Sequence, residues 1–263
     1  MISVIMGIYN NESTLKEAMD SIVGQTYTDW ELIMCDDGSV DNTYEIAKEF
    51  IKLHPDNKFK LIKHTKNMGL NQTLNDCLKE AEGEYIARMD GDDISLPNRF
   101  EEEIKFLDSN PQYALVSCPM IYFDDQGVFR VGRGGYEPLA KNFIKGTPFC
   151  HAPCMIRTQV IKEIGGYSIS KKLLRVEDYH LWYKMYMAGY KGYNLSESLY
   201  KMRDDRNAIS RRKYRFRINE AYVKYLIYKD MKPPKTYIIY ILKPLLVGLL
   251  PTPIYKILHK NRR

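Results

Sequence analysis

With 263 residues, of which 44% are hydrophobic and 27% charged, the chain is long enough for one large domain, and it is neither disordered nor collagen-like. Residues 201–263 hold 17 of the 39 Lys and Arg but only 4 of the 33 Asp and Glu, so a basic tail follows an acidic body. The five scattered cysteines argue against a disulfide framework and the opening residues against a secretory signal, so we expect a cytoplasmic protein.

Strand and helix patterns alternate over the first 120 residues. Short apolar runs predict buried strands at 2–8, 30–35, 59–62 and 85–89. Helical spacing of apolar residues predicts helices after Thr14, over 42–53, after Gly69 and from Pro97, the first with a capping box from Thr14 to Glu17. This alternation predicts an α/β fold with a mostly parallel central sheet covered by helices on both faces.

The pattern changes between residues 113 and 156 to short apolar runs and turn signals, including a glycine-rich stretch at 132–135. We expect strands or loops here that extend the sheet and shape a pocket. Helical spacing returns over 175–189, with Glu177 and Asp178 in the first turn.

Two acidic clusters follow the second and fourth predicted strands, at 36–39 and 90–93. The carboxyl ends of parallel strands meet at one edge of a sheet, and ligands bind at that edge in open α/β sheets. On a tight turn, Asp90 and Asp92 could both face one divalent cation, with Gly91 leaving room for close backbone approach. The alternative is that Asp93 or Ser95 caps the following helix.

Several segments occur in the order typical of one known family over about the first 200 residues. They are Ser3–Asn10, Gln25-Thr26-Tyr27, Glu31-Leu32-Ile33, Asp36–Thr43, Asn67-Met68-Gly69, Asp90–Asp93 and Glu177–Trp182. Together they resemble family 2 glycosyltransferases, which implies a GT-A fold with a single Rossmann-like nucleotide-binding domain and Mn²⁺ or Mg²⁺ as cofactor. The resemblance implies inverting transfer of a sugar from a nucleotide-sugar donor, most commonly a UDP-sugar. The Gln-x-x-Arg-Trp motif of processive members is absent, which favours single-sugar addition.

Carried over position by position, the resemblance implies that Asp178, with Glu177 beside it, is the catalytic base. It makes Asp92 the metal ligand, with Asp93 as the open alternative. The nucleotide-sugar would be contacted by Ile8, Tyr9, Asn10, Glu12, Asp37, Asn67, Gly69, Arg88, Asp90 and Gly91. His151 is a candidate on the acceptor side, although a packed histidine fits the sequence equally well. Acidic residues in a first helical turn also favour the helix dipole, which is the alternative for the 177–178 pair.

The expected organisation is a catalytic domain of residues 1–205, with a nucleotide-sugar-binding half (1–110) and an acceptor half (111–205), followed by a helical tail (206–263). Lys243 and prolines interrupt the apolar runs after residue 237, so we expect peripheral contact of 211–263 with an anionic membrane rather than a spanning helix. The alternative is a tail packed on the catalytic domain or on a second copy, as in a homodimer. No RNA-binding motif accompanies the tail, so nucleic acid is not an expected partner.

The overall pattern most resembles exopolysaccharide-biosynthesis glycosyltransferases of biofilm-forming Gram-positive bacteria. This implies a glycan or lipid-linked acceptor at the inner face of the cell membrane. The same group implies an alternative from another class, a protein-binding regulator such as a flagellar-motor inhibitor, with or without transferase activity.

Overall fold

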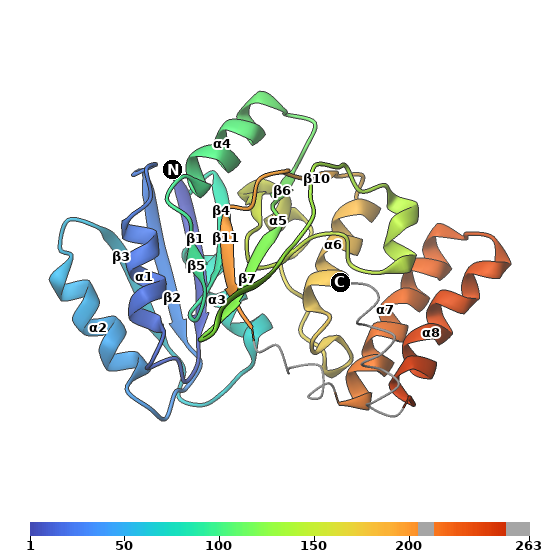
Figure 1. The fold of residues 1–263 in the computed structure, drawn as a ribbon, viewed down its shortest axis with the longest axis horizontal. Coiled ribbons are helices and arrows are strands. Elements are labelled where there is room, and N and C mark those ends of the chain that lie inside the picture. The colour runs from blue at the N-terminus through green and yellow to red at the C-terminus, as the bar shows by residue number, and fades with distance from the viewer. Residues whose placement is uncertain (205–212, 251–263) are drawn as a thin grey trace.

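The computed structural model describes residues 1–204 and 213–250, which form two sheets flanked by helices (Figure 1). The central sheet has the strand order β10-β6-β9-β4-β1-β2-β3. Its strands are β1 (Ile2–Ile8), β2 (Trp30–Asp36), β3 (Lys58–Lys63), β4 (Tyr85–Asp90), β6 (Leu115–Ser117), β9 (Met155–Arg157) and β10 (Gly192–Asn194). Only β9 pairs antiparallel to its neighbours, so the predicted mostly parallel sheet is confirmed.

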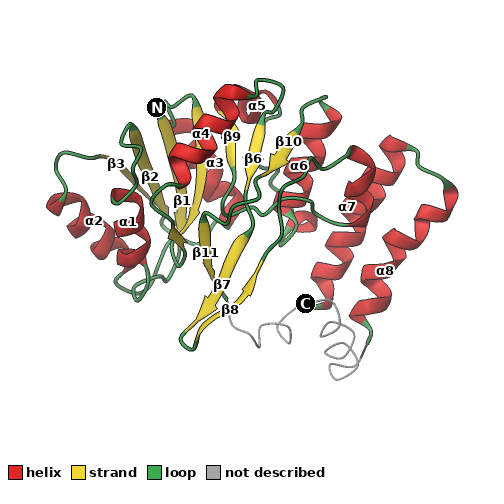
Figure 2. Ribbon diagram, turned by 45° about the horizontal axis from the view of Figure 1, so that its top comes forward, coloured by secondary structure: helices red, strands yellow, loops and turns green. Residues whose placement is uncertain are grey.

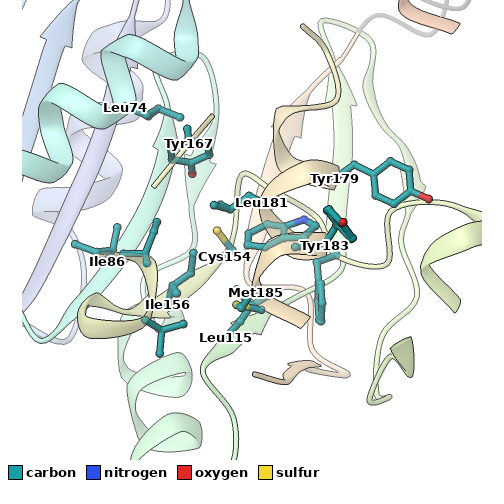
Figure 3. Close-up of a cluster of buried hydrophobic side chains, with 14 of the residues drawn as sticks. Leu74, Ile86, Leu115, Cys154, Ile156, Tyr167, Tyr179, Leu181, Tyr183 and Met185 are labelled. Atoms are coloured by element: carbon teal, nitrogen blue, oxygen red, sulfur yellow. The ribbon is translucent and has the colours of Figure 1, made fainter. Parts of the chain in front are cut away.

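Helices cover both faces of this sheet because β1, β2 and β4 are apolar on both sides. One face packs on α1 (Leu15–Val23), α2 (Thr43–Leu53) and α4 (Arg99–Ser109). The other packs on α3 (Leu70–Glu80), α5 (Thr158–Glu163) and α6 (Glu177–Met187). Figure 3 shows side chains of α6, among them Leu181 and Met185, lying toward Cys154, Ile156 and Leu115 of the sheet region.

A second sheet forms from residues beyond the first four strands, in the order β5-β11-β7-β8. Its strands are β5 (Ile94–Ser95), β7 (Met120–Asp124), β8 (Gly127–Val131) and β11 (Tyr200–Arg203) (Figure 2). The expectation that the 113–156 region extends the central sheet therefore holds for β6 and β9, but not for β7 and β8. Glycine is required at position 134 in the stretch after β8, because an added Cβ would lie 1.8 Å from the carbonyl oxygen of Leu195.

The capping box predicted at the start of α1 is not formed. The Thr14 hydroxyl donates to the carbonyl of Gly91 at 3.0 Å and makes no side-chain cap for its own helix. Glu17 forms an ion pair with Arg203 at 2.6 Å. Both side chains of the expected local motif are thus drawn into contacts with residues far along the chain.

The described part of the tail packs on the preceding part of the chain. Helix α7 (Tyr214–Met231) buries Val223 and Ile227 in the same core cluster as α6, beside the short 3₁₀ helices η1 (Ala140–Lys145) and η2 (Lys171–Leu173). After η4 (Lys235–Tyr237), helix α8 (Ile238–Gly248) returns against α7. None of the helices in these residues is long and apolar enough to cross a membrane. Residues 211–212 and 251–263 of the expected membrane segment lie outside the described residues.

Candidate functional site

The loops after β1, β2 and β4 meet because these strands are adjacent and in register. Ile8 at the end of β1 pairs with Asp36, and Gly7 pairs with Asp90. The carboxyl ends of the three strands therefore bring both acidic clusters to one edge of the sheet, as the sequence predicts.

Hydrogen bonds join the loop after β1 to the loop after β2. The Asn10 amide donates to Ser39 Oγ at 3.0 Å, and Asn10 Oδ1 accepts from the Val40 amide at 3.0 Å. Glu12 accepts from both the backbone and the side chain of Asn42. Asn10 has a φ of 53°, a left-handed conformation that asparagine tolerates better than most residues. The side chains of Asn10 and Glu12 thus hold the two loops together.

Three other predicted nucleotide-sugar contacts differ in accessibility. The Ile8 side chain is buried in the core, and its carbonyl accepts from the Asp37 amide at 2.9 Å. Tyr9 is 44% exposed and Asn67 is also exposed, so both side chains are open to a ligand at this edge.

Asp37 is surrounded by donors from the protein itself. Its Oδ1 accepts from the Met68 amide at 2.7 Å and lies 2.9 Å from His64 Nδ1, while its Oδ2 accepts from the Gly69 amide at 2.9 Å. Gly69 has a φ of 89°, which favours glycine, so the Asp37 carboxylate holds a sharply turned loop. Next to it, buried Asp36 accepts from the Ser39 amide through Oδ2, while Oδ1 has no partner in the described residues.

The second acidic cluster is organised around a buried arginine. The Arg88 guanidinium forms two hydrogen bonds with the Asp90 carboxylate, at 2.9 and 2.5 Å. Such bidentate pairs are strong and fix geometry, so the charge of Asp90 is largely compensated. The Asp92 carboxylate is half-buried and accepts no hydrogen bond from any other described residue. Burial, together with the Asp90 charge, raises its pKa despite a hydrogen bond from its own amide.

Asp93 lies deeper than Asp92. Its Oδ1 accepts from the Arg203 amide at 2.8 Å, and its buried Oδ2 has no partner in the described residues. Burial first, and then the charges of Asp90 and Asp92, raise the pKa of Asp93. The capping alternative is wrong, because Asn98 is the N-cap residue of α4 and the Ser95 hydroxyl accepts from Gln25.

Gly91 is buried against the loop after β1. An added Cβ would lie 3.1 Å from both Asn11 Oδ1 and Ile8 Cγ2, so its immediate neighbours are protein side chains. With the hydrogen bond from Thr14 to its carbonyl, Gly91 fastens the acidic loop to the end of β1.

The donor set of the second acidic loop fits a divalent cation completed by a ligand. Three carboxylates lie within four residues, and an oxygen of Asp93 is buried without a donor. No group of three His, Cys, Asp or Glu side chains within the described residues is arranged to hold a metal by itself. Mg²⁺ is commonly bound by one or two carboxylates together with phosphate oxygens, an arrangement that this loop can supply.

Glu177 and Asp178 begin α6 and are half-buried. Burial first, and the neighbouring Glu177 charge second, raise the pKa of Asp178 to about 6, against the opposing charge of Arg88. Arg88 also acts on Asp90 and Asp92. One arginine therefore lies within electrostatic reach of both the acidic loop and α6.

His151 is within electrostatic reach of the same arginine and is held by aromatic neighbours. Its Nε2 is 2.8 Å from the Tyr167 hydroxyl, and its ring packs edge-on against Trp182. Burial and the charge of Arg88 lower its pKa well below the ordinary value, so the ring is neutral at physiological pH. These contacts favour the packed-histidine alternative, while the half-buried ring keeps some exposure.

Two residues of β11 support the acidic loop and were not singled out from the sequence. The Tyr200 hydroxyl accepts from the Asp90 amide at 3.2 Å, and Arg203 Nε donates to the Asp92 carbonyl at 3.1 Å. Both lie more than 100 positions from the loop, and no motif or spacing in the sequence signals the contact.

Models of two related families match the chain. Glycosyl transferase family 2 matches residues 3–165, and Glycosyl transferase family group 2 matches residues 85–257. EpsE of Bacillus subtilis (strain 168) is 41% identical over 261 residues, covering 99% of this chain and 94% of EpsE. WfaP of Escherichia coli, named as a UDP-Glc:alpha-D-GlcNAc-diphosphoundecaprenol beta-1,3-glucosyltransferase, is 29% identical over 196 residues, covering 74% of this chain and 73% of WfaP.

Solved structures share the fold. S. aureus TarS 1–349 in complex with UDP matches with a TM-score of 0.69 and 20% identity, over 93% of this chain and 69% of TarS. The mannosyltransferase PcManGT from Pyrobaculum calidifontis, in complex with GDP-Man and Mn²⁺, matches with a TM-score of 0.66 and 19% identity, over 99% of this chain and 79% of PcManGT. The family and fold expected from the sequence are thus confirmed: the chain belongs to glycosyl transferase family 2 and is a glycosyltransferase with the GT-A fold.

Proposed function

We propose that the protein is a metal-dependent, inverting, non-processive glycosyltransferase of bacterial surface polysaccharide synthesis. It would transfer a sugar from a UDP-sugar to a hydroxyl of a glycan or lipid-linked acceptor. The observation that carries the proposal is that Arg88, which is bonded to Asp90 of the Asp90–Asp93 loop, also lies within electrostatic reach of Asp178. A donor diphosphate with its cation and an acceptor hydroxyl with its base need such adjacent carboxylates.

The names of relatives support the choice of donor, cofactor and acceptor. WfaP is named for a UDP-glucose donor and a diphosphoundecaprenol-linked acceptor, and TarS was solved with UDP. PcManGT was solved with GDP-Man and Mn²⁺, which supports Mn²⁺ or Mg²⁺ as cofactor and keeps a guanosine donor as the comparison to test. The alternative of a protein-binding regulator gains no support from these comparisons and is not proposed.

Within this proposal, Asp178 accepts the proton of the acceptor hydroxyl as its oxygen attacks the anomeric carbon. A carboxylate with a pKa of about 6 is mostly ionised at pH 7 yet more basic than an ordinary aspartate, which suits a general base. Neutralisation of diphosphate charge is the chemistry that a bound Mn²⁺ or Mg²⁺ supplies at Asp92. Inversion follows if Asp178 lies on the face of the sugar opposite the leaving diphosphate.

Asp92 rather than Asp93 is the proposed metal ligand. Its carboxylate is half-buried and receives no hydrogen bond from any other described residue, whereas Asp93 is buried and already accepts from Arg203. Tyr9 and Asn67 are the exposed side chains proposed to contact the nucleotide, and His151 remains a proposed acceptor-side neighbour. A lipid-linked acceptor requires contact with the inner face of the cell membrane, for which residues 211–263 are the proposed segment.

Calorimetric titration of UDP and UDP-sugars into the full chain, with Mn²⁺ and then with a chelator, tests the donor site. We expect metal-dependent binding that is at least about 100-fold weaker in Asp92→Ala, because even indirect metal supports are typically worth 10–100-fold. Asp56→Ala, which removes an exposed aspartate distant in sequence from both acidic loops, is the control and should bind normally. Absence of binding for uridine, guanosine and thymidine donors alike would contradict the proposal.

A further inference from the structure

Helix α8 is apolar around almost its whole circumference. Its 11 residues, Ile238–Gly248, include a single charged side chain, Lys243. A helix that is hydrophobic on all sides is ordinarily buried on all sides. We therefore expect each apolar face of α8 to be covered, either by this protein or by a partner.

One face of α8 is covered by the protein. Pro244 is buried, and Tyr240 and Ile241 pack against the core cluster that includes α7. At the far end, an added Cβ on Gly248 would lie 2.8 Å from the ring of Tyr214, so the two helices form a close antiparallel hairpin.

The other face is open in the part of the chain that the structure describes. The large side chains on this side are between 47% and 69% exposed, and they are Ile238, Ile239, Leu242, Leu246 and the C-cap residue Leu249. At about 100° per residue these positions share one stripe, which we call the outer face of α8. Figures 1 and 2 both show α8 as the outermost helix, on the far side of α7 from the sheet. A contiguous exposed apolar stripe of this kind marks an interaction surface.

The charge of the hairpin indicates what covers this face. Residues 213–250 contain eight Lys and Arg against two Asp and Glu, and Lys235 and Lys243 are exposed at or beside the stripe. A symmetric pairing with a second copy would bring two hairpins of net positive charge together. An anionic lipid surface satisfies both features, because it accepts apolar side chains below a layer of negative headgroups.

We propose that the outer face of α8 inserts into the surface of an anionic lipid bilayer. An 11-residue helix is about 16 Å long, well short of the roughly 30 Å hydrocarbon core, so it lies in the interface. Leu242 and Leu246 enter the acyl boundary, while Lys235 and Lys243 reach the headgroups. The inference deepens the membrane contact named in the proposed function. The contact itself is argued from α8, and only its role in reaching a lipid-linked acceptor rests on the proposed function.

Vesicle flotation with the full chain tests this inference. We expect flotation with vesicles of phosphatidylcholine and phosphatidylglycerol, and much less with phosphatidylcholine alone. The double variant Leu242→Ser, Leu246→Ser should lower the vesicle-bound to free ratio at least about tenfold, since two aliphatic side chains no longer enter the bilayer. Val128→Ser with Val131→Ser, at similarly exposed apolar positions on β8, is the matched control and should float like the wild type.

A second pair of substitutions separates charge from insertion. Lys235→Gln with Lys243→Gln should reduce the preference for phosphatidylglycerol while leaving the Leu242 and Leu246 contribution in place. Addition of salt should weaken wild-type flotation in the same direction.

Three outcomes would overturn the inference: no flotation of the wild type, equal flotation of the leucine variant, or a lipid-free dimer that the leucine substitutions dissociate. The last, measured by light scattering, would assign the outer face to a second copy. UDP titration of the same variants keeps the two proposals apart. Retained donor binding without flotation would refute the membrane contact and leave the proposed transferase function intact. Flotation without donor binding would refute the proposed transferase function and leave the membrane contact intact.

Discussion

The two acidic loops lie at the same sheet edge, yet their carboxylates are in opposite situations. After β2, Asp37 receives two backbone N–H donors and lies against His64. After β4, Asp92 accepts only from its own amide among the described residues, and Asp93 has one satisfied and one unsatisfied oxygen. Both loops read as acidic turns in the sequence, but the surrounding donors distinguish them.

Under the proposed function, the difference separates a carboxylate that holds a loop from one that holds a ligand. A carboxylate already bonded to backbone amides stabilises the fold and has little capacity left for a cation. Crowded carboxylates with raised pKa values are costly in the free protein, and a cation or a proton relieves that cost. Asp178 resembles the second group, because burial and Glu177 raise its pKa too.

The largest expected effect is at Asp178. Asp178→Asn should lower turnover by about 10²–10⁴-fold, the usual contribution of a placed base, while UDP binding measured by calorimetry is retained. Glu177→Gln is the control and should keep most activity. Loss of turnover in Glu177→Gln with full turnover in Asp178→Asn would show that the base is the other carboxylate.

The pH dependence follows from the same carboxylate. Because the base acts only when ionised, wild-type kcat/KM should fall as pH drops through about 6, the pKa of Asp178. Asp178→Asn should lack this acidic limb. An acidic limb near pH 4 in the wild type would mean that Asp178 is not the titrating base.

Stability measurements should contrast the two loops directly. Asp37→Ala leaves two amides and His64 without their acceptor and should lower the free energy of unfolding by about 3 kcal/mol. Asp92→Asn should leave it unchanged or raise it at pH 7. The pKa of Asp92 is raised in the folded protein, so its ionisation costs stability as pH rises above the ordinary value of 3.8. Urea unfolding without metal measures both, and a larger loss in Asp92→Asn would reverse the comparison.

A smaller effect is expected at Arg203, which donates to the carbonyl of Asp92, the proposed metal ligand. Arg203→Ala should weaken Mn²⁺ affinity in the presence of UDP by about tenfold, the lower range for residues that support a metal ligand, with kcat at saturating metal little changed. Glu17→Gln, which removes only the surface ion pair with Arg203, is the control. A fall in kcat with unchanged metal affinity would contradict a positioning role.

Much of the fold could be predicted because buried parallel strands leave an unmistakable pattern. The predicted strand 2–8 coincides with β1, and 30–35 and 85–89 each fall one residue short of β2 and β4. Strands covered on both faces appear as continuous apolar runs, so their position needs no long-range information. The second sheet was missed because β5, β7, β8 and β11 are short and pair residues distant in the chain, such as Tyr200 with Ser95.

The sequence by itself determined the strand–helix alternation, the family, and the placement of both acidic clusters at one sheet edge. These depend on apolar periodicity and chain order, which are local properties. Only the tertiary structure decided that Asp37 is donor-rich and Asp92 donor-poor, that Thr14 bonds Gly91 instead of capping α1, and that α8 keeps one apolar face exposed. Those outcomes depend on which donors and side chains from distant segments lie next to each group in the folded protein. The residues close to that group in sequence do not indicate which ones these are.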